Sequence, residues 1–185
     1  MPTQLSAVVT PPDSDENLML AYKAGQASAF EQLYRRHKDA VFRYFLRQGL
    51  ATAVAEELSH DTWLRIINHR ENYVANALFK TYLFTIARHI VIDHTQKKST
   101  RQELTELQEL AAEEAAEGGT ALQQALKQQI AALPFEQRQT FVLKQESGFS
   151  IEQIAEMTQQ SKEKVKSSWR YALQKLRQGL SQYVD

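Results

Sequence analysis

Apolar residues recur at helical spacing along most of the chain, and no segment alternates between apolar and polar residues as a half-buried strand would. The first helical pattern begins at Asp15, a candidate N-cap, and ends near Gly25. A second pattern begins at Ser28, which forms a capping-box pattern with Glu31, and stops at Gly49. The spacing therefore predicts two consecutive helices at the start of the chain, each followed by a glycine.

Two further helices are predicted before the helical pattern breaks. One begins at Thr52, a candidate N-cap. Its apolar face holds Leu58, Thr62 and Ile66. The other helix covers about 78–96 and is apolar on nearly every side, which is typical of a helix at the centre of its domain. We expect Phe79 and Leu83 of this helix to be core residues.

Residues 99–121 break the pattern, because they are rich in Glu and Gln, hold few bulky side chains and include Gly118 and Gly119. We interpret them as a linker that is helical in part at most. Its acidic residues are Glu103, Glu106, Glu109, Glu113, Glu114 and Glu117. We expect the linker to be mobile, and its carboxylates to be drawn to basic surfaces elsewhere on the chain and to mask them.

Helical periodicity resumes at Leu122 and continues to Pro134, and a further helix from about 135 to 146 stops at Gly148. No strand pattern competes with the helical one anywhere. The sequence therefore predicts an all-α fold of two small helical domains joined by the acidic linker.

The end of the chain shows a helix-turn-helix pattern. Ser150 and Gln153 make a capping box before a short helix, and after a polar turn Ser161 caps a long amphipathic helix. The basic residues opposite the apolar stripe of that helix lie four residues apart, at Lys162, Lys166 and Arg170. Such a helix fits the major groove of DNA, where Lys and Arg reach base acceptors or phosphates. The alternative is an ordinary solvated basic face.

The charge distribution supports two DNA-facing surfaces. The 22 basic and 22 acidic residues of the chain give a net charge of zero, but they are unevenly placed. Residues 80–101 hold five basic residues against one acid, and residues 161–178 hold six against one. The acidic linker lies between these two segments, so a neutral total remains compatible with two basic surfaces.

Several classes of site are excluded by composition. The chain has no cysteine, which rules out disulfides, thiolate zinc sites and cysteine nucleophiles. It also has no Ser-His-Asp set, glycine-rich phosphate loop or His-Glu-x-x-His motif. No apolar run of about eighteen residues occurs, and Met1–Pro12 lacks the features of a secretory signal, so we interpret it as a loose tail. We expect a cytoplasmic protein without membrane insertion.

The C-terminal part resembles region 4 of the sigma-70 family, the helix-turn-helix module that reads the −35 promoter element. The resemblance is carried by Leu133-Pro134, Phe149-Ser150, Ile154-Ala155 and Val165-Lys166-Ser167. It implies DNA contacts in the major groove at Lys162, Lys164, Lys166, Ser167, Arg170 and Tyr171. Of these, Lys162 and Lys164 are expected to lie on phosphates and the other four nearest the bases.

The N-terminal part resembles region 2 of the same family. The resemblance is carried by Ala27-Ser28-Ala29-Phe30, Leu33-Tyr34-Arg35-Arg36, Glu57-Leu58, Asp61-Thr62-Trp63-Leu64-Arg65 and Tyr82-Leu83-Phe84 with Ile86-Ala87-Arg88 and Asp93. It implies binding of core polymerase at Leu58, Asp61, Trp63, Leu64 and Arg65. It implies melting and recognition of the −10 element at Lys80, Tyr82, Arg88, His89, Lys97 and Lys98. We assign Asp93 a structural role, either as a cap or as an ion-pair partner of Arg88 or Lys97.

The two resemblances occur in this order without a third domain between them, which indicates a sigma factor of the extracytoplasmic-function (ECF) type. The implied organisation is a tail at 1–14, region 2 at 15–98, the linker at 99–121 and region 4 at 122–182. The resemblance implies core RNA polymerase and promoter DNA as partners, and an anti-sigma factor as a further candidate partner. It implies no enzymatic activity, no cofactor and no metal.

The sequence departs from the family pattern at several positions that bear on promoter choice. His89 stands where Asn is usual, and Tyr82 where Trp is common. Ser168 replaces a frequent Arg, Lys164 replaces a frequent Thr, and the turn of the helix-turn-helix lacks its usual Gly. We expect these departures to alter the preferred promoter sequence and not the class of function.

Three other interpretations belong to different classes. A helical metal phosphohydrolase would use the His60-Asp61 pair together with His37 and Asp93. A helix-turn-helix regulator would bind its DNA tightly without polymerase. An adaptor would bind another regulator without reading DNA, and the basic cluster of the last helix argues against that function.

Overall fold

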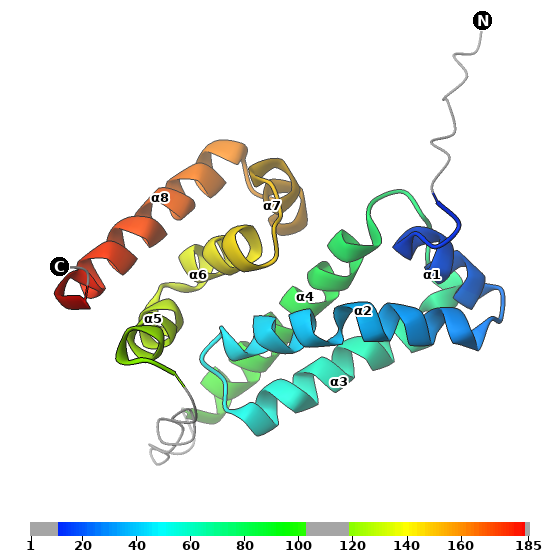
Figure 1. Cartoon of the computed structure of the whole chain (residues 1–185), viewed down its shortest axis with the longest axis horizontal. Helices are drawn as coiled ribbons and strands as arrows, with labels where there is room; N and C mark the ends of the chain where they lie inside the picture. Colours follow the sequence, from blue (N-terminus) through cyan, green and yellow to red (C-terminus); the bar gives the residue numbers. More distant parts are fainter. Residues whose placement is uncertain (1–10, 103–118, 184–185) are drawn as a thin grey trace, which may run out of the picture.

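The computed structural model describes residues 11–102 and 119–183, and every regular element within these ranges is helical. The tail expected at 1–14 therefore lies largely outside the described residues, and so does most of the acidic linker with its expected mobility and masking role. The described part forms two helical lobes, which we call the first lobe (11–102) and the second lobe (119–183) (Figure 1). The all-α prediction is confirmed.

The first lobe is built around its last helix. Its elements are α1 (Asp15–Lys23), α2 (Ala27–Leu46), α3 (Thr52–Asn68), the short 3-10 helix η1 (Arg70–Asn72) and α4 (Phe79–Gln102). Helices α1, α2 and α3 all contact α4. As the sequence predicts, Phe79 and Leu83 of α4 are completely buried. Each buried side chain of this size contributes about 1.5–3 kcal/mol relative to an exposed one, so α4 is the core of the lobe.

The second lobe consists of short helices packed on one long helix. Its elements are α5 (Ala121–Ala132), α6 (Phe135–Phe141), the π-helical turn η2 (Val142–Glu146), α7 (Ile151–Thr158), α8 (Lys162–Gly179) and the 3-10 helix η3 (Ser181–Tyr183). Helix α8 packs against α5, α6 and α7. Its buried residues include Val165, Ala172 and Leu176, which lie on the apolar stripe predicted from the sequence.

Helix boundaries follow local capping in the second lobe. Ser150 and Gln153 form the predicted capping box of α7, and the Ser161 side chain accepts a hydrogen bond from the backbone N–H of Lys164 at the start of α8. A further capping box, which the sequence reasoning missed, joins Thr120 and Gln123 at the start of α5.

Three caps predicted for the first lobe are wrong. Ser14, and not Asp15, caps α1, because the Asp15 carboxylate is engaged by side chains of α2. Ser28 lies inside α2, which begins at Ala27, so its predicted capping box does not form. Helix α3 has Thr52 as its first residue, and no side chain caps its N-terminus.

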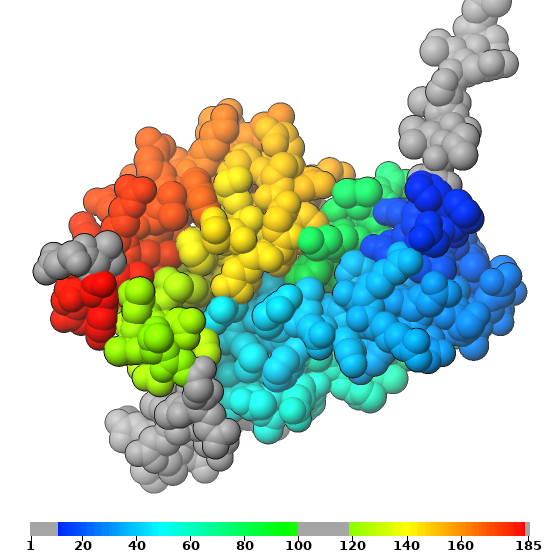
Figure 2. Space-filling view, in the orientation of Figure 1, coloured from blue at the N-terminus to red at the C-terminus, as the bar shows by residue number. Residues whose placement is uncertain are grey.

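The two lobes pack directly against each other. In the space-filling view the second lobe continues the surface of the first without a separating space on this face (Figure 2). Helices α4 and α7 are in contact, although they are far apart in sequence. Part of the surface of α4 that faces α7 is therefore covered by the second lobe in this conformation.

The turn of the helix-turn-helix contains a residue in a conformation that favours glycine. Gln159 has φ 54° and ψ 41°, and among the described residues other than glycine it alone has a positive φ. The turn uses this conformation to end α7, because the N–H groups of Gln159 and Gln160 donate to the last carbonyls of that helix. The glycine missing from the sequence pattern is thus replaced by a strained glutamine.

Replacing Gln159 by Gly is expected to stabilise the protein by about 0.5–1 kcal/mol, because the relief of left-handed strain exceeds the entropy that glycine loses on folding. Urea denaturation followed by circular dichroism measures the change. The matched control is Gln26→Gly, where φ is −84° and no left-handed strain can be relieved. A stability gain at Gln26 equal to that at Gln159 would contradict the explanation.

Candidate nucleic-acid interface

The outer face of α8 carries all six residues predicted to contact the −35 element. Lys162, Lys164, Lys166, Arg170 and Tyr171 are exposed, and Ser167 is half-buried between them. We call this set the recognition face. Its residues span a wide arc of the first half of the helix, because Lys162, Lys166 and Arg170 form one row while Lys164 and Tyr171 lie further round. A contact of α8 with DNA could therefore use a wide arc of the helix.

The inner side of α8, opposite the recognition face, packs against α6. Trp169 of α8 stacks on Phe141 of α6 with ring centres 5.7 Å apart, and the Lys144 ammonium lies 5.4 Å from the Trp169 ring. Ser168, which replaces a frequent Arg, is only 9% exposed and faces the interior of the lobe. The side chain at this position is therefore not part of the recognition face.

Residues predicted to act on the −10 element lie along α4 in three different environments. His89, Lys97 and Lys98 are exposed. Tyr82 is half-buried, and its ring lies 5.2 Å from that of Tyr73. Burial raises the pKa of Tyr82, so this hydroxyl stays protonated across the physiological range. His89 borders a groove of about 270 Å³ between α4 and α7, which leaves its ring accessible.

Lys80 and Arg88, the other two residues of this set, are held by the second lobe. Arg88 is 8% exposed, and its guanidinium lies 3.5 Å from the Glu136 carboxylate. The Lys80 ammonium donates a hydrogen bond to the backbone carbonyl of Ser147 and lies 5.1 Å from the Phe149 ring. Burial lowers the pKa of Lys80. Neither side chain is free to contact DNA in this conformation.

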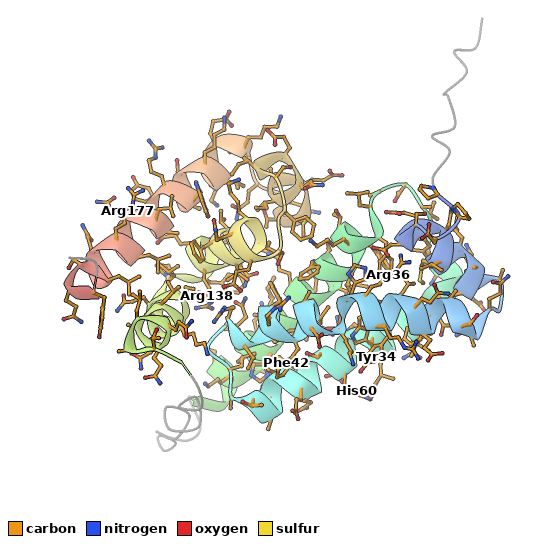
Figure 3. All side chains as sticks on the ribbon, viewed as in Figure 1. Tyr34, Arg36, Phe42, His60, Arg138 and Arg177 are labelled. Atoms are coloured by element: carbon orange, nitrogen blue, oxygen red, sulfur yellow. The ribbon has the colours of Figure 1, made fainter. Side chains whose placement is uncertain are left out.

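A buried set of hydrogen bonds joins the lobes at the end of α2. The Tyr44 hydroxyl donates to Gln139 Oε1 at 2.5 Å, and Gln139 Nε2 donates to Gln48 Oε1 at 2.6 Å. Arg138 Nε also donates to Gln48 Oε1, at 3.0 Å. Burial is the main cause of the raised pKa of Tyr44, so its hydroxyl remains a donor. Figure 3 places Arg138 on α6, on the side that faces the first lobe.

Two contacts flank these hydrogen bonds. Arg47 Nε donates to Glu146 Oε1 at 2.6 Å, and the rings of Phe84 and Phe149 meet edge to face at 5.5 Å. We call all these interactions, together with those of Lys80 and Arg88, the lobe contact. It combines apolar packing with directed hydrogen bonds, which fixes one relative position of the lobes.

The residues predicted to bind polymerase divide between core and surface. Leu58 and Trp63 are buried, with exposed fractions of 6% and 5%, whereas Leu64 is 40% exposed. Asp61 is half-buried. Arg65 forms an ion pair with Asp93 at 3.1 Å, so Asp93 pairs with α3 and not with the expected Arg88 or Lys97.

Sequence reasoning missed Tyr34 as a surface residue, because its helical spacing resembles that of core residues. Tyr34 is 41% exposed, and its ring packs edge to face on Trp63 at 5.2 Å. The Lys38 ammonium lies 5.8 Å from the Tyr34 ring. A basic residue one helical turn after Tyr34 is the sequence feature that could have indicated its exposure. Tyr34 packs on Trp63, and the exposed Leu64 follows Trp63 in α3. We call these three residues the aromatic patch. Figure 3 shows Tyr34 on the side of the first lobe that points away from the second.

The residues proposed for a metal phosphohydrolase do not converge. His37 Nε2 lies 2.7 Å from Asp15 Oδ2, and Asp93 is paired with Arg65. Within residues 11–102 and 119–183, no group of three or more acidic or histidine side chains is arranged to hold a metal ion. The hydrogen bond with His37 is the main cause of the lowered pKa of Asp15.

Comparison with known proteins gives matches to both lobes. Residues 33–101 match the family model of sigma-70 region 2, and residues 123–176 match that of sigma-70 region 4. The ECF RNA polymerase sigma factor SigL of Mycobacterium tuberculosis is 30% identical over 159 residues, which cover 83% of this chain and 90% of SigL. BldN of Streptomyces coelicolor is 35% identical over 98 residues, half of this chain but only 37% of BldN.

The fold is also known from solved structures. The sigma factor RpoE of Bartonella quintana, solved in complex with the anti-sigma factor NepR, matches with a TM-score of 0.71 at 24% identity, covering 84% of this chain and 98% of RpoE. The matches to the region 2 and region 4 models, in this order along the chain, define a protein of the sigma-70 class. The chain belongs to the ECF family of RNA polymerase sigma factors. No helix within the described ranges is long and apolar enough to cross a membrane.

The close approach of Gly49 to Ala131 gives a means of loosening the lobe contact. A Cβ atom added to Gly49 would lie 2.9 Å from the Ala131 Cβ, and Gly49 also has a φ of +78°. Gly49→Ala is therefore expected to shift the lobes apart, since overpacking of this kind costs about 1–3 kcal/mol. Because the chain has no native cysteine, dyes attached through Glu57→Cys and Lys175→Cys report the separation by energy transfer.

The control for Gly49→Ala is Gly25→Ala. Gly25 has a φ of +106°, but an added Cβ there would meet no atom within 4 Å. This variant carries the backbone strain without the clash and is expected to keep the energy transfer of the unsubstituted protein. Equal energy transfer in the unsubstituted protein, Gly49→Ala and Gly25→Ala would show that the close approach of Gly49 to Ala131 does not determine the separation of the lobes.

Proposed function

We propose that this protein binds core RNA polymerase and directs it to promoters, with α8 reading the −35 element and α4 opening and reading the −10 element. The observation that carries the proposal is the recognition face, an exposed basic surface on the second helix of a helix-turn-helix inside the region 4 match. It is an initiation factor that works by binding and strand opening, without catalysis of its own. Its place of action is the cytoplasm.

At the −35 element, the residues of the recognition face take two roles. Lys166, Ser167, Arg170 and Tyr171 lie nearest the base edges, where Arg can pair with guanine acceptors. Lys162 and Lys164, near the N-terminus of α8, contact phosphates and supply affinity that does not depend on sequence. The packing of Trp169 on Phe141 supports this assignment, because it holds α8 rigidly while its outer face docks.

At the −10 element, the accessible residues of α4 act first. Lys97 and Lys98 attract the backbone, while His89 and Tyr82 contact an unstacked base, which aromatic and polar side chains capture together. Lys80 and Arg88 can contact DNA only after the lobes separate, because Ser147 and Glu136 bind these two side chains while the lobes are in contact. Binding to polymerase supplies the energy for this separation.

The aromatic patch is the proposed docking surface for core polymerase. Exposed apolar groups beside charged ones are typical of protein interfaces, and Tyr34 and Leu64 are exposed with Asp61 nearby on α3. Leu58 belongs to the core of the lobe, and Arg65, which is paired with Asp93, follows Leu64 in α3. An anti-sigma factor, the kind of partner present in the RpoE structure, is a further candidate ligand of the conformation in which the lobes are in contact.

Substitution on the recognition face is expected to separate specific from non-specific binding. Arg170→Ala should change the preferred −35 sequence, with a loss of about 1–3 kcal/mol confined to one base position. Lys162→Ala should weaken all sequences alike and flatten the salt dependence. The measurement is promoter binding by the reconstituted holoenzyme across a set of single-base −35 variants at several salt concentrations.

Two outcomes bear against these assignments. Losses from Arg170→Ala that are the same for every −35 sequence would remove its role as a base reader. Tight, specific binding by the free protein, with no gain from core polymerase, would instead favour the helix-turn-helix regulator.

The aromatic patch is tested by Leu64→Ser, which is expected to weaken binding to core polymerase about tenfold, because the leucine would be buried on complex formation. Titration of a fluorescently labelled protein with core polymerase, followed by anisotropy, measures the affinity. Leu20→Ser in α1 is the matched control, since Leu20 is also 40% exposed but lies outside the patch. Equal losses for the two variants would place the docking surface elsewhere.

A further inference from the structure

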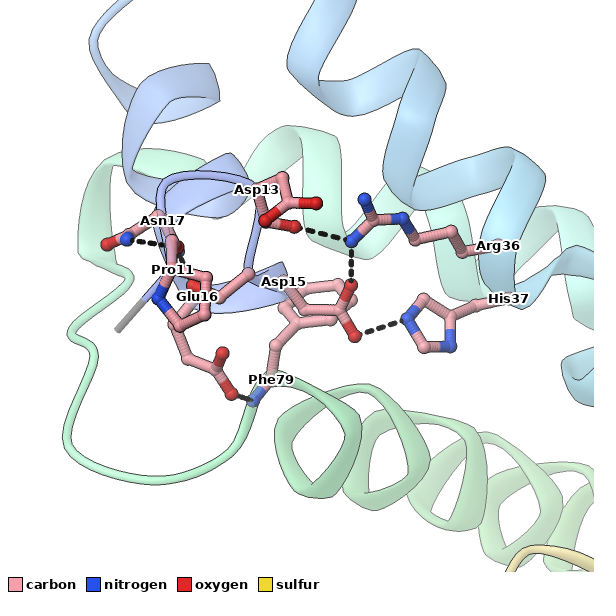
Figure 4. Close-up of polar contacts among 9 residues, drawn as sticks. Pro11, Asp13, Asp15, Glu16, Asn17, Arg36, His37 and Phe79 are labelled. Atoms are coloured by element: carbon pink, nitrogen blue, oxygen red, sulfur yellow. Dashed lines mark hydrogen bonds and ion pairs between the residues drawn. The ribbon is translucent and has the colours of Figure 1, made fainter. Parts of the chain in front are cut away.

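Helix α4 begins without a cap of its own. The residue before it is the apolar Leu78, and its first turn contains no acidic residue. The N–H of Phe79, which has no acceptor within α4, donates instead to Glu16 Oε1 of α1, at 2.9 Å (Figure 4). Glu16 therefore caps α4 from a separate helix and places a carboxylate at the positive end of the helix dipole.

The same helix α1 also holds the segment that leads into α4. The Lys23 ammonium donates to the backbone carbonyl of Tyr73 at 2.9 Å. Between this point and Phe79, residues 74–78 are all exposed, and Val74 reaches 65%. The exposed loop runs between Tyr73 and Phe79, which are both buried, and Lys23 and Glu16 each add a hydrogen bond to the backbone at one of these two ends.

Helix α1 is in turn anchored to α2. Arg36 Nη1 donates to Asp15 Oδ1 at 3.0 Å and to the backbone carbonyl of Asp13 at 2.7 Å, while His37 Nε2 lies 2.7 Å from Asp15 Oδ2. Figure 4 shows this cluster beside the Glu16 contact with Phe79. The adjacent residues Asp15 and Glu16 thus link α2 to the start of α4 through α1.

We propose that α1 is a positioning element for promoter opening, in which Glu16 and Lys23 hold the 73–79 segment and the first turn of α4 in place. This inference rests on the proposed function, because the residues it positions, Lys80 and Tyr82, belong to the candidate −10 surface. Neither Glu16 nor Lys23 needs to touch DNA. Their effect falls on strand opening and not on initial docking, since docking through the recognition face involves the other lobe.

The test compares Glu16→Ala with Glu16→Gln in the reconstituted holoenzyme. Glu16→Ala is expected to lower the ratio of open to closed promoter complexes about fivefold, the effect of one lost helix cap. Binding to duplex promoter DNA in the closed complex should stay unchanged. Glu16→Gln retains an acceptor oxygen and should restore most of the ratio. Lys23→Met should lower the ratio in the same direction as Glu16→Ala.

The matched control is Glu31→Ala in α2. Glu31 is an exposed carboxylate of the same lobe whose partner is Arg35, one turn along its own helix. This variant is expected to leave the open-to-closed ratio at the value of the unsubstituted protein. A fall equal to that of Glu16→Ala would show a general effect of charge and overturn the inference.

Amide hydrogen exchange at Phe79 separates positioning from mere stability. Glu16→Ala should accelerate exchange at this amide while the amides of α2 keep their rates. Faster exchange at Phe79 together with an unchanged open-to-closed ratio would make Glu16 a structural cap only and overturn the inference. Failure of the unsubstituted holoenzyme to open any promoter would refute the proposed function instead, so the two failures are distinguishable.

Discussion

The central constraint on this structure is that α4 is both the core of the first lobe and a candidate DNA surface. Phe79, Leu83 and Phe84 are completely buried, so most of the circumference of α4 is committed to packing. Only a few positions remain for polar contacts, and two of them, Lys80 and Arg88, face the second lobe. The relative position of the lobes therefore decides how much of α4 a nucleic acid can reach.

Part of the lobe contact is polar, and this part opposes separation of the lobes only weakly. Gln48 Oε1 accepts hydrogen bonds from Gln139 and Arg138, and in water each of these groups would find a new partner. A typical intramolecular hydrogen bond therefore contributes only about 0.5–1.5 kcal/mol net. The apolar part includes the edge-to-face pair of Phe84 and Phe149, and the buried apolar residues of the two lobes form one continuous cluster. A partner that binds the separated lobes better can shift such an equilibrium by its difference in affinity for the two states.

The sequence predicted features that depend on local spacing and missed those that depend on distant pairing. The row of Lys162, Lys166 and Arg170 follows from residues four apart on one helix, whereas the other residues of the recognition face came from the family resemblance. The capping box of α7 follows from residues three apart. By contrast, Arg88 meets Glu136 across 48 residues, which periodicity cannot reveal. The predicted cap at Asp15 was wrong for the same reason, because its carboxylate is taken by α2. The site residues of α8 could thus be placed from sequence, whereas the state of those on α4 could not.

The first turn of α4 is held from two directions, and only one of them belongs to the lobe contact. Lys80 is bonded to the second lobe through Ser147, whereas its neighbour Phe79 is bonded to α1 through Glu16. If the lobes part, as the proposed function requires, Lys80 loses its partner but the turn that carries it keeps its cap. The lysine is then released from an ordered helix and not from a frayed one, so less conformational entropy is lost when it binds a new partner. Helix α1 lies before the matched region 33–101, yet it supplies this order, because the geometry of α4 depends on a residue that no local pattern connects to it.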